Sequence, residues 1–266
     1  MQITLLQGLG MGLVGFICKL DQQTEAFYWF RPIVVSFLAG LVLGDPALGV
    51  ACGAVSELAY LGMTFVGGTV PPDPLLAGMM TVVIAFTTGQ NAETALGLSY
   101  PFALLAQMLG IMINTAMVFV AHKLDDCAER ADADAFMRWT FAPWFVVSAL
   151  WFVLVFLCSY ALQVPIQNFV ATFPEWVSHG FEVAGNILPA VGLAMLMLTT
   201  LKLDTAPYLM IGFVMATFLV LPNVLPVAIV GVALAFINYL HEKKMDGIAA
   251  AAASSTYLEG GDEDGI

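Results

Sequence analysis

Charged residues are scarce in this chain of 266 residues: they make up 11% of it, whereas soluble domains average about 25%. Hydrophobic residues account for 60%, and the mean hydropathy is +0.90. Basic residues are the rarest charged class, with 8 against 20 acidic residues, which gives a formal net charge of −12. The composition predicts an integral membrane protein, and the lack of a basic footprint argues against nucleic-acid binding.

Sequence motifs for metals, disulfides and common enzymes are also missing. None of the four cysteines forms a CxxC pair, so neither a metal site nor a disulfide framework is predicted. There is no P-loop, no HExxH and no GxSxG motif, and the three histidines have no repeated spacing. We therefore expect no cofactor and no metal, and a hydrolytic or redox enzyme is disfavoured.

Apolar runs are present, but those of the N-terminal half are short. A helix needs about 20 apolar residues to cross the hydrocarbon core of a bilayer. The early runs fall short of this length or are interrupted, one long run follows, and the C-terminal half offers four passes. In chain order they are residues 3–18, 32–43, 47–66, 75–87, 96–121, 141–162, 181–201, 207–221 and 224–240. The sequence predicts an all-α, polytopic helical bundle with broken or re-entrant helices.

Hydrophilic sequence divides the chain into four regions. Residues 1–121 form an N-terminal membrane half with the candidate solute site, and residues 122–138 form a loop. Residues 139–240 form a C-terminal membrane half, and residues 241–266 form an acidic tail whose composition predicts disorder. The loop and the start of the tail hold five of the eight basic residues. The positive-inside rule therefore places both in the cytoplasm and residues 163–179 outside.

The stretch 53–74 sets a carboxylate, Glu57, in an apolar run and then breaks regular structure. The break contains Gly67, Gly68 and three prolines, and it holds a second carboxylate at Asp73. An ionised side chain at membrane depth costs about 3 kcal/mol or more unless it is paired or faces water. Irregular backbone is tolerated there only where protein buries it or where it lines a cavity. The stretch predicts a polar pocket; the alternative is a helix end near the headgroups followed by an exposed turn.

A second carboxylate in a Gly- and Pro-interrupted apolar run is Glu182, so inverted repeats of the two halves are a further possibility. Gln107 and Asn114, on the long run 96–121, are expected to satisfy helix contacts. Carboxylates, amides and backbone carbonyls on broken helices suit a neutral, hydroxyl-rich ligand, because hydroxyl groups donate to such acceptors.

The stretch 31–74 also resembles the membrane IIC subunit of the mannose/fructose/sorbose family of phosphoenolpyruvate-dependent sugar phosphotransferase systems. The Arg-Pro opening, the Leu-Gly-Asp turn at 43–45, the Glu57 segment and the Gly-Pro-Asp break carry this resemblance. It extends over nearly the whole chain. Residues 179–192 and the closing Asp-Gly-Ile are similar to the branch that takes N-acetylgalactosamine and galactosamine. Residues 63–65 depart from the mannose-specific members, which weakens mannose as the substrate.

The resemblance implies a sugar-translocating IIC permease subunit in the bacterial inner membrane, moving a hexose or amino sugar. It also implies a hetero-oligomer with a IID membrane subunit and soluble IIA and IIB phosphocarrier proteins, and IIB would phosphorylate the sugar on entry. No phosphate-accepting residue is evident in this chain. Together with the residues above, the resemblance gives the candidate sugar-binding residues Glu57, Thr64, Gly67, Gly68, Thr69, Asp73, Glu182 and Asn186.

Two other functions remain open at this point. An ion-coupled secondary transporter would use Glu57 or Glu182 as a proton or sodium site, but few membrane acids are available and none has a basic partner in its own run. A non-transporting assembly subunit would leave the Gly/Pro break without a purpose. In the first apolar run, Gly8, Gly12 and Gly15 would face one way on a helix and admit either a partner subunit or another helix of the same chain.

Overall fold

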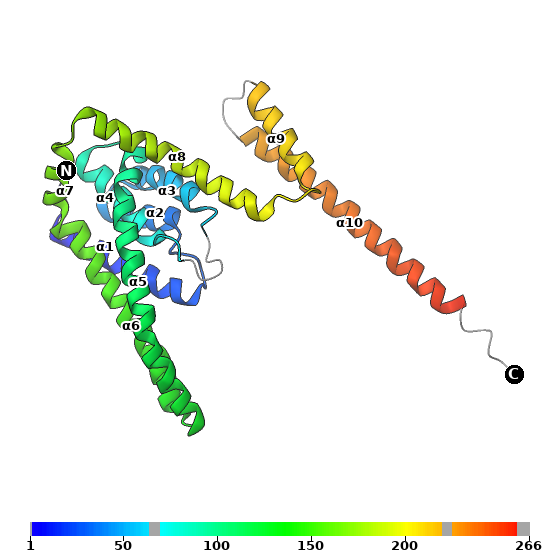
Figure 1. Ribbon diagram of the computed structural model, residues 1–266, viewed down its shortest axis with the longest axis horizontal. Coiled ribbons are helices and arrows are strands. Elements are labelled where there is room, and N and C mark those ends of the chain that lie inside the picture. Colours follow the sequence, from blue (N-terminus) through cyan, green and yellow to red (C-terminus); the bar gives the residue numbers. More distant parts are fainter. Residues whose placement is uncertain (1, 64–69, 220–224, 260–266) are drawn as a thin grey trace. The chain divides into compact units, whose positions relative to one another are not determined.

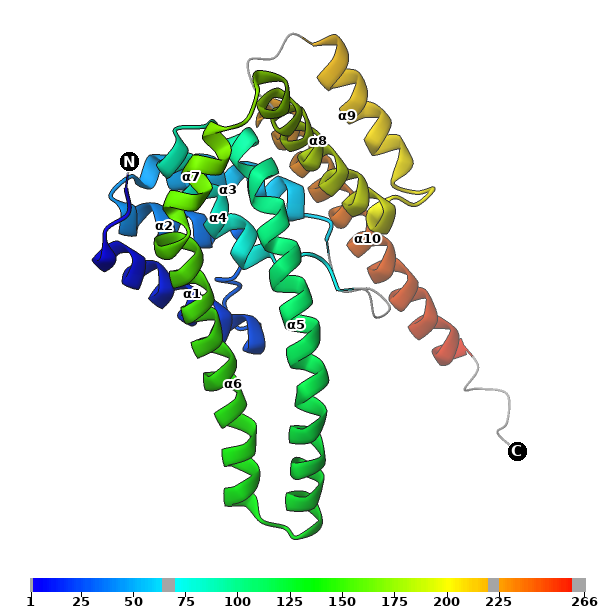
Figure 2. The ribbon, with the colours of Figure 1, turned by 60° about the vertical axis from the view of Figure 1, so that its left-hand side comes forward.

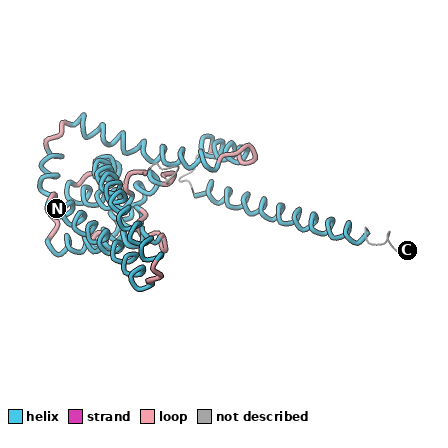
Figure 3. The backbone as a smooth tube through the Cα atoms, turned by 60° about the horizontal axis from the view of Figure 1, so that its bottom comes forward, coloured by secondary structure: helices cyan, strands magenta, loops and turns pink. Residues whose placement is uncertain are grey.

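The computed structural model describes residues 2–63, 70–219 and 225–259, and every regular element in these ranges is a helix (Figures 1 and 3). The chain divides into two compact units, Met1–Thr199 and Thr200–Ile266. The first unit holds the elements α1 (Leu5–Thr24), α2 (Pro32–Leu43), α3 (Pro46–Tyr60), α4 (Pro74–Thr88), α5 (Ala92–Glu129), α6 (Ala133–Phe156), η1 (Leu157–Ala161), α7 (Gln163–Ala171) and α8 (Glu175–Thr200). The predicted all-α fold is confirmed.

Local sequence signals explain where the early helices begin and end. Gly44 ends α2 in the left-handed region, with φ +85°, a conformation that glycine adopts without steric cost. Asp45 then caps α3, because its carboxylate accepts a hydrogen bond from the Leu48 N–H at 3.0 Å. Asp73 caps α4 in the same manner, and a proline follows each of these caps at the first helical position.

The centre of the first unit is α4, whose residues from Leu75 to Ala85 are all buried. It packs on α2, α3, α5 and α7. Apolar area gains little when it moves from lipid into protein, so close packing and interhelical hydrogen bonds must hold such helices together. The Thr81 hydroxyl supplies two of these bonds: it accepts from Ser56 at 3.3 Å and donates to Ser99 at 2.9 Å. Because protein surrounds α4, this helix of 15 residues need not cross a bilayer by itself.

Two glycines let α2 and α3 meet backbone to backbone. A Cβ on Gly49 would lie 2.6 Å from the Ser36 carbonyl oxygen and 2.9 Å from the Cα of Gly40. Backbone atoms cannot move aside as a flexible side chain can. This contact fixes the α2–α3 hairpin whose far ends carry Arg31 and Glu57.

Gly49→Ala is therefore expected to destabilise the folded protein by about 1–3 kcal/mol, the usual cost of overpacking. Gly110→Ala is the matched control, because nothing lies within 4 Å of a Cβ at Gly110 on α5 and alanine is the better helix former. Thermal unfolding of both purified variants measures the difference. Equal melting temperatures for the two variants would contradict the close contact.

The glycine face of α1 packs within this chain. A Cβ on Gly8, Gly12 or Gly15 would approach side chains of α6 and η1, at Tyr160, Phe152 and Val155 respectively. Of the two partners that the sequence left open, the structure therefore selects a helix of the same chain. A partner subunit would have to contact another face of α1.

The helices α5 and α6 run side by side as a long antiparallel pair that extends beyond the other helices of the first unit (Figure 2). They include most of the hydrophilic residues 122–138, which were expected as a loop but are helical on both sides of the turn at 130–132. α8 crosses the start of α5, where Gly185 lies against the backbone of Glu93.

Among the described residues, four helices are long and apolar enough to cross a membrane: Ala92–Glu129, Ala133–Ala161, Glu175–Thr200 and Leu225–Met245. The predicted pass at 207–221 corresponds to α9 (Ala206–Phe218), which has 13 residues and is not among them. α9 and α10 (Leu225–Glu259) form a helical pair in the second unit. The sidedness of the termini and of residues 163–179, and the inverted repeats, remain predictions.

Candidate functional site

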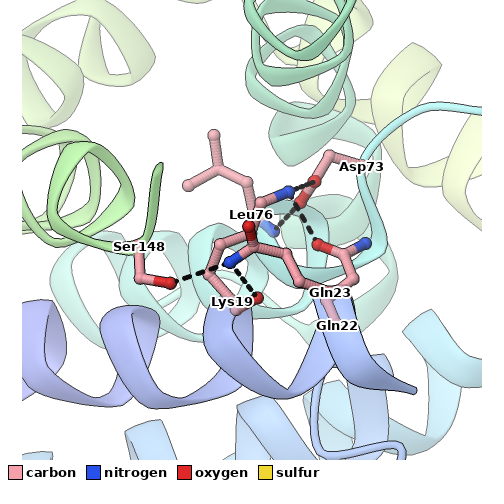
Figure 4. A network of polar contacts seen from close by, with 6 residues as sticks. All are labelled: Lys19, Gln22, Gln23, Asp73, Leu76 and Ser148. Atoms are coloured by element: carbon pink, nitrogen blue, oxygen red, sulfur yellow. Dashed lines mark hydrogen bonds and ion pairs between the residues drawn. The ribbon is translucent and has the colours of Figure 1, made fainter. Parts of the chain in front are cut away.

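Of the site residues predicted from the sequence, Asp73 has the most polar surroundings. Its Oδ1 accepts a hydrogen bond from the Leu76 N–H at 2.8 Å, which is the cap of α4. Its Oδ2 lies 3.8 Å from the Nζ of Lys19 on α1 (Figure 4). The side chains of Lys19 and Asp73 are only 13% and 8% exposed. One carboxylate oxygen therefore holds the helix, and the other faces a buried cation at a distance too long for a direct hydrogen bond.

Lys19 is held by three different groups. Its ammonium donates to Oε1 of Gln22 at 2.8 Å and lies 3.7 Å from the centre of the Trp151 ring on α6. The attraction between the ammonium and the ring face adds to the attraction of Asp73. A buried ammonium needs such compensation, because its transfer out of water is costly. The sequence analysis did not identify Lys19 as a site residue.

Two glutamines extend this polar group. The amide nitrogen of Gln23 donates to the Ser148 hydroxyl at 3.0 Å and to the Trp144 carbonyl at 3.1 Å, so α1 is joined to α6. The amide nitrogen of Gln107 on α5 donates to the carbonyl of Val70. Both nitrogens thus have protein partners, whereas the amide oxygens have none among the described residues. Those oxygens remain available to accept from a ligand.

A cavity of about 390 Å³ lies between these side chains, and we call it the Trp151 cavity. Its polar lining comes from α1, from the start of α4 and from the middle of α5, and α6 contributes tryptophans. The lining residues relevant here are Lys19, Gln22, Gln23, Asp73, Gln107 and Trp151. Volumes of about 300–1,000 Å³ are usual for small-molecule sites.

A second cavity, of about 510 Å³, adjoins the first, and we call it the Tyr60 cavity. The two share Lys19, Gln22, Gln23, Pro71 and Pro74 as lining residues. The remaining wall of the Tyr60 cavity includes Phe30, Arg31, Tyr60 and Met63. The turn that precedes Arg31 is fixed by Asp21, whose carboxylate oxygens accept from the N–H groups of Phe27 at 2.9 Å and Trp29 at 2.6 Å.

Glu57 is paired with Arg31, which precedes it by 26 residues in the chain. The guanidinium donates twice to Oε1 of Glu57, from Nε at 2.8 Å and from Nη2. Oε2 accepts from the N–H of Ile33 at 3.2 Å. Both carboxylate oxygens thus have partners in the protein. Glu57 lines neither cavity, whereas Arg31 lines the Tyr60 cavity.

The remaining predicted residues lie elsewhere. Glu182 on α8 accepts from the Asn91 amide at 3.4 Å and lies 3.5 Å from Nδ1 of His179, and Asn186 is exposed. Neither lines the Trp151 cavity or the Tyr60 cavity. Thr64, Gly67, Gly68 and Thr69 lie outside the described residues. Within the described ranges no cluster of three or more histidine, cysteine, aspartate or glutamate side chains could hold a metal ion.

The sequence reasoning missed Lys19, Gln22 and Gln23, although a signal was present. They form the polar end of the first apolar run, in the sequence Lys-Leu-Asp-Gln-Gln. Such an end is usually taken as a headgroup-level flank. Gln107 was assigned to helix contacts, but its amide nitrogen donates to the carbonyl of Val70, which lies outside the helices; its place in the cavity lining was not foreseen.

Comparison with known proteins places this arrangement in a transport family. Residues 5–237 match the family described as "PTS system sorbose-specific iic component". The N-acetylgalactosamine permease IIC component 1 of Escherichia coli (strain K12) is 42% identical over 242 residues, which is 91% of each chain. The PTS system mannose-specific EIIC component of the same strain is 28% identical over 262 residues, or 96% of each chain.

Two solved structures share the fold. A chain described as "Structure of membrane protein" superposes with a TM-score of 0.77 at 27% identity, and the match covers 90% of this chain and 97% of that chain. A chain from the "CryoEM Structure of Mannose Transporter ManYZ and Microcin E492 (MceA) complex" gives a TM-score of 0.56 at 26% identity with the same coverage.

These findings decide between the functions that the sequence left open. The family match covers most of the chain, and the curated relatives are IIC components along nearly their whole length. An ion-coupled transporter and a non-transporting assembly subunit are therefore set aside. The chain belongs to the sorbose-specific IIC component family of the phosphotransferase system and is a sugar-translocating, multi-pass membrane subunit of such a system.

Proposed function

We propose that this subunit carries N-acetylgalactosamine or galactosamine, and that the sugar binds beside Lys19 and Asp73 in the Trp151 cavity. The observation that carries the site is the set of polar atoms around one cavity, several of which have no hydrogen-bond partner among the described residues. Oδ2 of Asp73 and the amide oxygens of Gln23 and Gln107 are acceptors, and the amide nitrogen of Gln22 is a donor. The choice of sugar is supported by the 42% identical relative, which is named for N-acetylgalactosamine.

The chemistry of the cavity fits a hydroxyl-rich sugar. Each sugar hydroxyl can donate to one neighbour and accept from another, so a mixed lining of carboxylate, amides and an ammonium can satisfy it. Lys19 and Asp73 compensate each other's charge, so the ligand need bring none. At 3.8 Å their charged atoms leave room for a ligand hydroxyl to bridge them.

The Gly/Pro break remains part of the proposed site. Gln107 donates to the carbonyl of Val70, and Pro71 lines both cavities. In the sequence these two residues directly follow the stretch that contains the predicted site residues Thr64, Gly67, Gly68 and Thr69. We assign Glu57 a positioning role, because it acts on the Tyr60 cavity through Arg31. Glu182 and Asn186 are not included, since neither lines the Trp151 cavity or the Tyr60 cavity.

The same proposal includes the other components of the system and the location. We place the chain in the bacterial inner membrane, in a hetero-oligomer with a IID membrane subunit, and we assign phosphorylation of the incoming sugar to IIB after phosphate transfer through IIA. Support comes from the family and from the solved relative, which is named as part of a transporter complex. Affinity purification of the tagged chain should recover the IID subunit from the membrane.

The substrate is tested by phosphoenolpyruvate-dependent uptake of radiolabelled sugars. The chain, co-expressed with IID, IIA and IIB proteins of the same system, should restore uptake of N-acetylgalactosamine or galactosamine in cells that lack their own system. Mannose and sorbose serve as comparison sugars. Uptake of mannose or sorbose without either amino sugar would overturn the proposed substrate.

A further inference from the structure

The Trp151 cavity extends beyond the polar group on α1 and α4. Along α5 its lining continues from Gln107 to Leu124, and along α6 it continues from Trp151 to Trp139. At 1.5 Å per residue, this stretch of α5 is about 25 Å long. The cavity therefore follows the antiparallel pair of Figure 2 toward the hydrophilic end of that pair, and we call the part beyond Gln107 the α5–α6 groove.

The groove lies on one side of α5, and the opposite side has a different character. Its lining recurs every three or four positions along the helix, at Gln107, Gly110, Asn114, Met117 and Ala121, and residues with this spacing share one side. The other side carries large apolar side chains that are each at least 60% exposed: Leu105, Met108, Met112 and Phe119. Such a side suits contact with lipid. The side of α5 that suits lipid is thus separate from the side that lines the groove.

Asn114 places an amide in the groove without a partner of its own. It lies on α5, one of the helices long and apolar enough to cross a membrane. The sequence analysis expected Asn114 to satisfy a helix contact, but its side chain makes no hydrogen bond with any residue that the structure describes. A polar group without a partner is costly at membrane depth. Because Asn114 is exposed and lines the groove, a molecule in the groove can reach it.

Gly110 leaves space in the groove one helical turn from Gln107. A Cβ on Gly110 would meet no atom within 4 Å, whereas a Cβ on a glycine of α1 would approach side chains of α6 and η1. Glycine is also less favourable than alanine inside a helix, by about 1 kcal/mol. Helix packing therefore does not require glycine here, and its effect is to widen the groove.

We propose that the α5–α6 groove is the path along which the sugar leaves its site beside Lys19 and Asp73 for the cytoplasm. The positive-inside rule assigns the hydrophilic end of the pair, residues 122–138, to the cytoplasm. Asn114 is a second hydrogen-bonding position for sugar hydroxyls, about 10 Å along α5 from Gln107. This inference rests on the proposed function, because it starts from the proposed site, and it adds the route of release.

Modification of single cysteines tests whether the groove holds water. In inside-out membrane vesicles that contain the complete complex, a hydrophilic methanethiosulfonate reagent should modify Asn114→Cys at least about tenfold faster than Met112→Cys, because a thiol in apolar surroundings seldom ionises. The two positions lie at almost the same depth but on opposite sides of α5. The four native cysteines are buried, and the unsubstituted protein measures their background. Equally slow modification of both variants would show a lipid-filled groove and overturn the path.

A bulky side chain at Gly110 tests whether the sugar passes through the groove. Gly110→Trp should lower phosphoenolpyruvate-dependent uptake by more than about tenfold, because the indole occupies the open space beside Gly110. Met112→Trp is the matched control: it places the same ring on the opposite side of α5, and uptake should stay within about twofold of the wild type. Uptake is normalised to the membrane abundance of each variant, and the cysteine experiment remains decisive if Gly110→Trp does not fold.

Two further results would overturn the path while the proposed function stands. They are wild-type uptake by a normally abundant Gly110→Trp and equal losses of uptake in Gly110→Trp and Met112→Trp. Failure of the unsubstituted complex to take up either amino sugar would instead overturn the proposed substrate, and the cysteine modification would still report on the groove.

Discussion

Replacing Lys19 by methionine is expected to weaken sugar binding by about ten- to a hundredfold without preventing membrane insertion. Methionine retains an apolar stem beside Trp151 but removes the ammonium that faces Asp73 and donates to Gln22. A hydrogen bond to a charged group contributes about 1.5–3 kcal/mol, which corresponds to roughly 10–150-fold in affinity. The loss also leaves Asp73 as a buried carboxylate without its cation.

Lys123→Met is the matched control for this experiment. Lys123 also pairs with an aspartate, since its Nζ lies 3.2 Å from Oδ2 of Asp126, but the two side chains are 42% and 50% exposed. Exposed pairs of this kind contribute about 0–1 kcal/mol, so binding should change by less than about fivefold. Both variants are compared by equilibrium sugar binding to purified complex. Wild-type affinity in Lys19→Met would remove Lys19 from the site and the Trp151 cavity from the proposal.

Lys19→Arg provides a finer test of geometry. Arginine keeps the positive charge but replaces a compact ammonium with a longer, planar group. The planar guanidinium cannot take the exact position of the ammonium between Gln22, the Trp151 ring and Asp73, so some of these contacts are lost. We expect sugar affinity between those of the wild type and Lys19→Met, measured in the same binding assay. Restoration of full affinity would show that charge alone is required.

Local sequence signals allowed much of the fold to be predicted. The Gly-Asp-Pro turn at 44–46 and the Asp-Pro pair at 73–74 contain the atoms that end one helix and cap the next. These atoms lie within a few residues of one another, so the outcome depends little on the rest of the protein. The short run at 75–87 was recognised for the same reason, and its structure as α4 explains why it need not span a membrane alone.

The pairing of distant polar residues could not be predicted in the same way. Lys19 contacts residues of α6 and the start of α4, and Glu57 contacts Arg31 on the preceding helix. Nothing in the sequence near Glu57 specifies this partner, because the pairing depends on how α2 packs on α3. Glu182 was chosen by analogy with Glu57, yet its packing gives it a half-exposed position beside His179. Pattern alone identifies polar residues in apolar runs but not which of them share a cavity.

Glu57→Gln is expected to lower sugar uptake by about tenfold or more in a complex of normal abundance. Glutamine keeps the shape of the side chain and can still accept from Ile33, but it cannot neutralise the guanidinium of Arg31. Arg31 would then present an uncompensated charge to the Tyr60 cavity. Glu129→Gln, at the exposed end of α5, is the control and should transport at the wild-type rate.

The double variant Arg31→Gln with Glu57→Gln separates a positioning role from direct contact with the sugar. If Glu57 acts only through Arg31, the two changes affect one interaction, and the double variant should lose no more uptake than the more impaired single variant. If Glu57 also accepted a bond from the sugar, its loss would add to that of Arg31. Because both carboxylate oxygens already have partners in Arg31 and Ile33, we expect the first result. Uptake rates for the four proteins, normalised to membrane abundance, complete the cycle, and additive losses would assign Glu57 to the sugar itself.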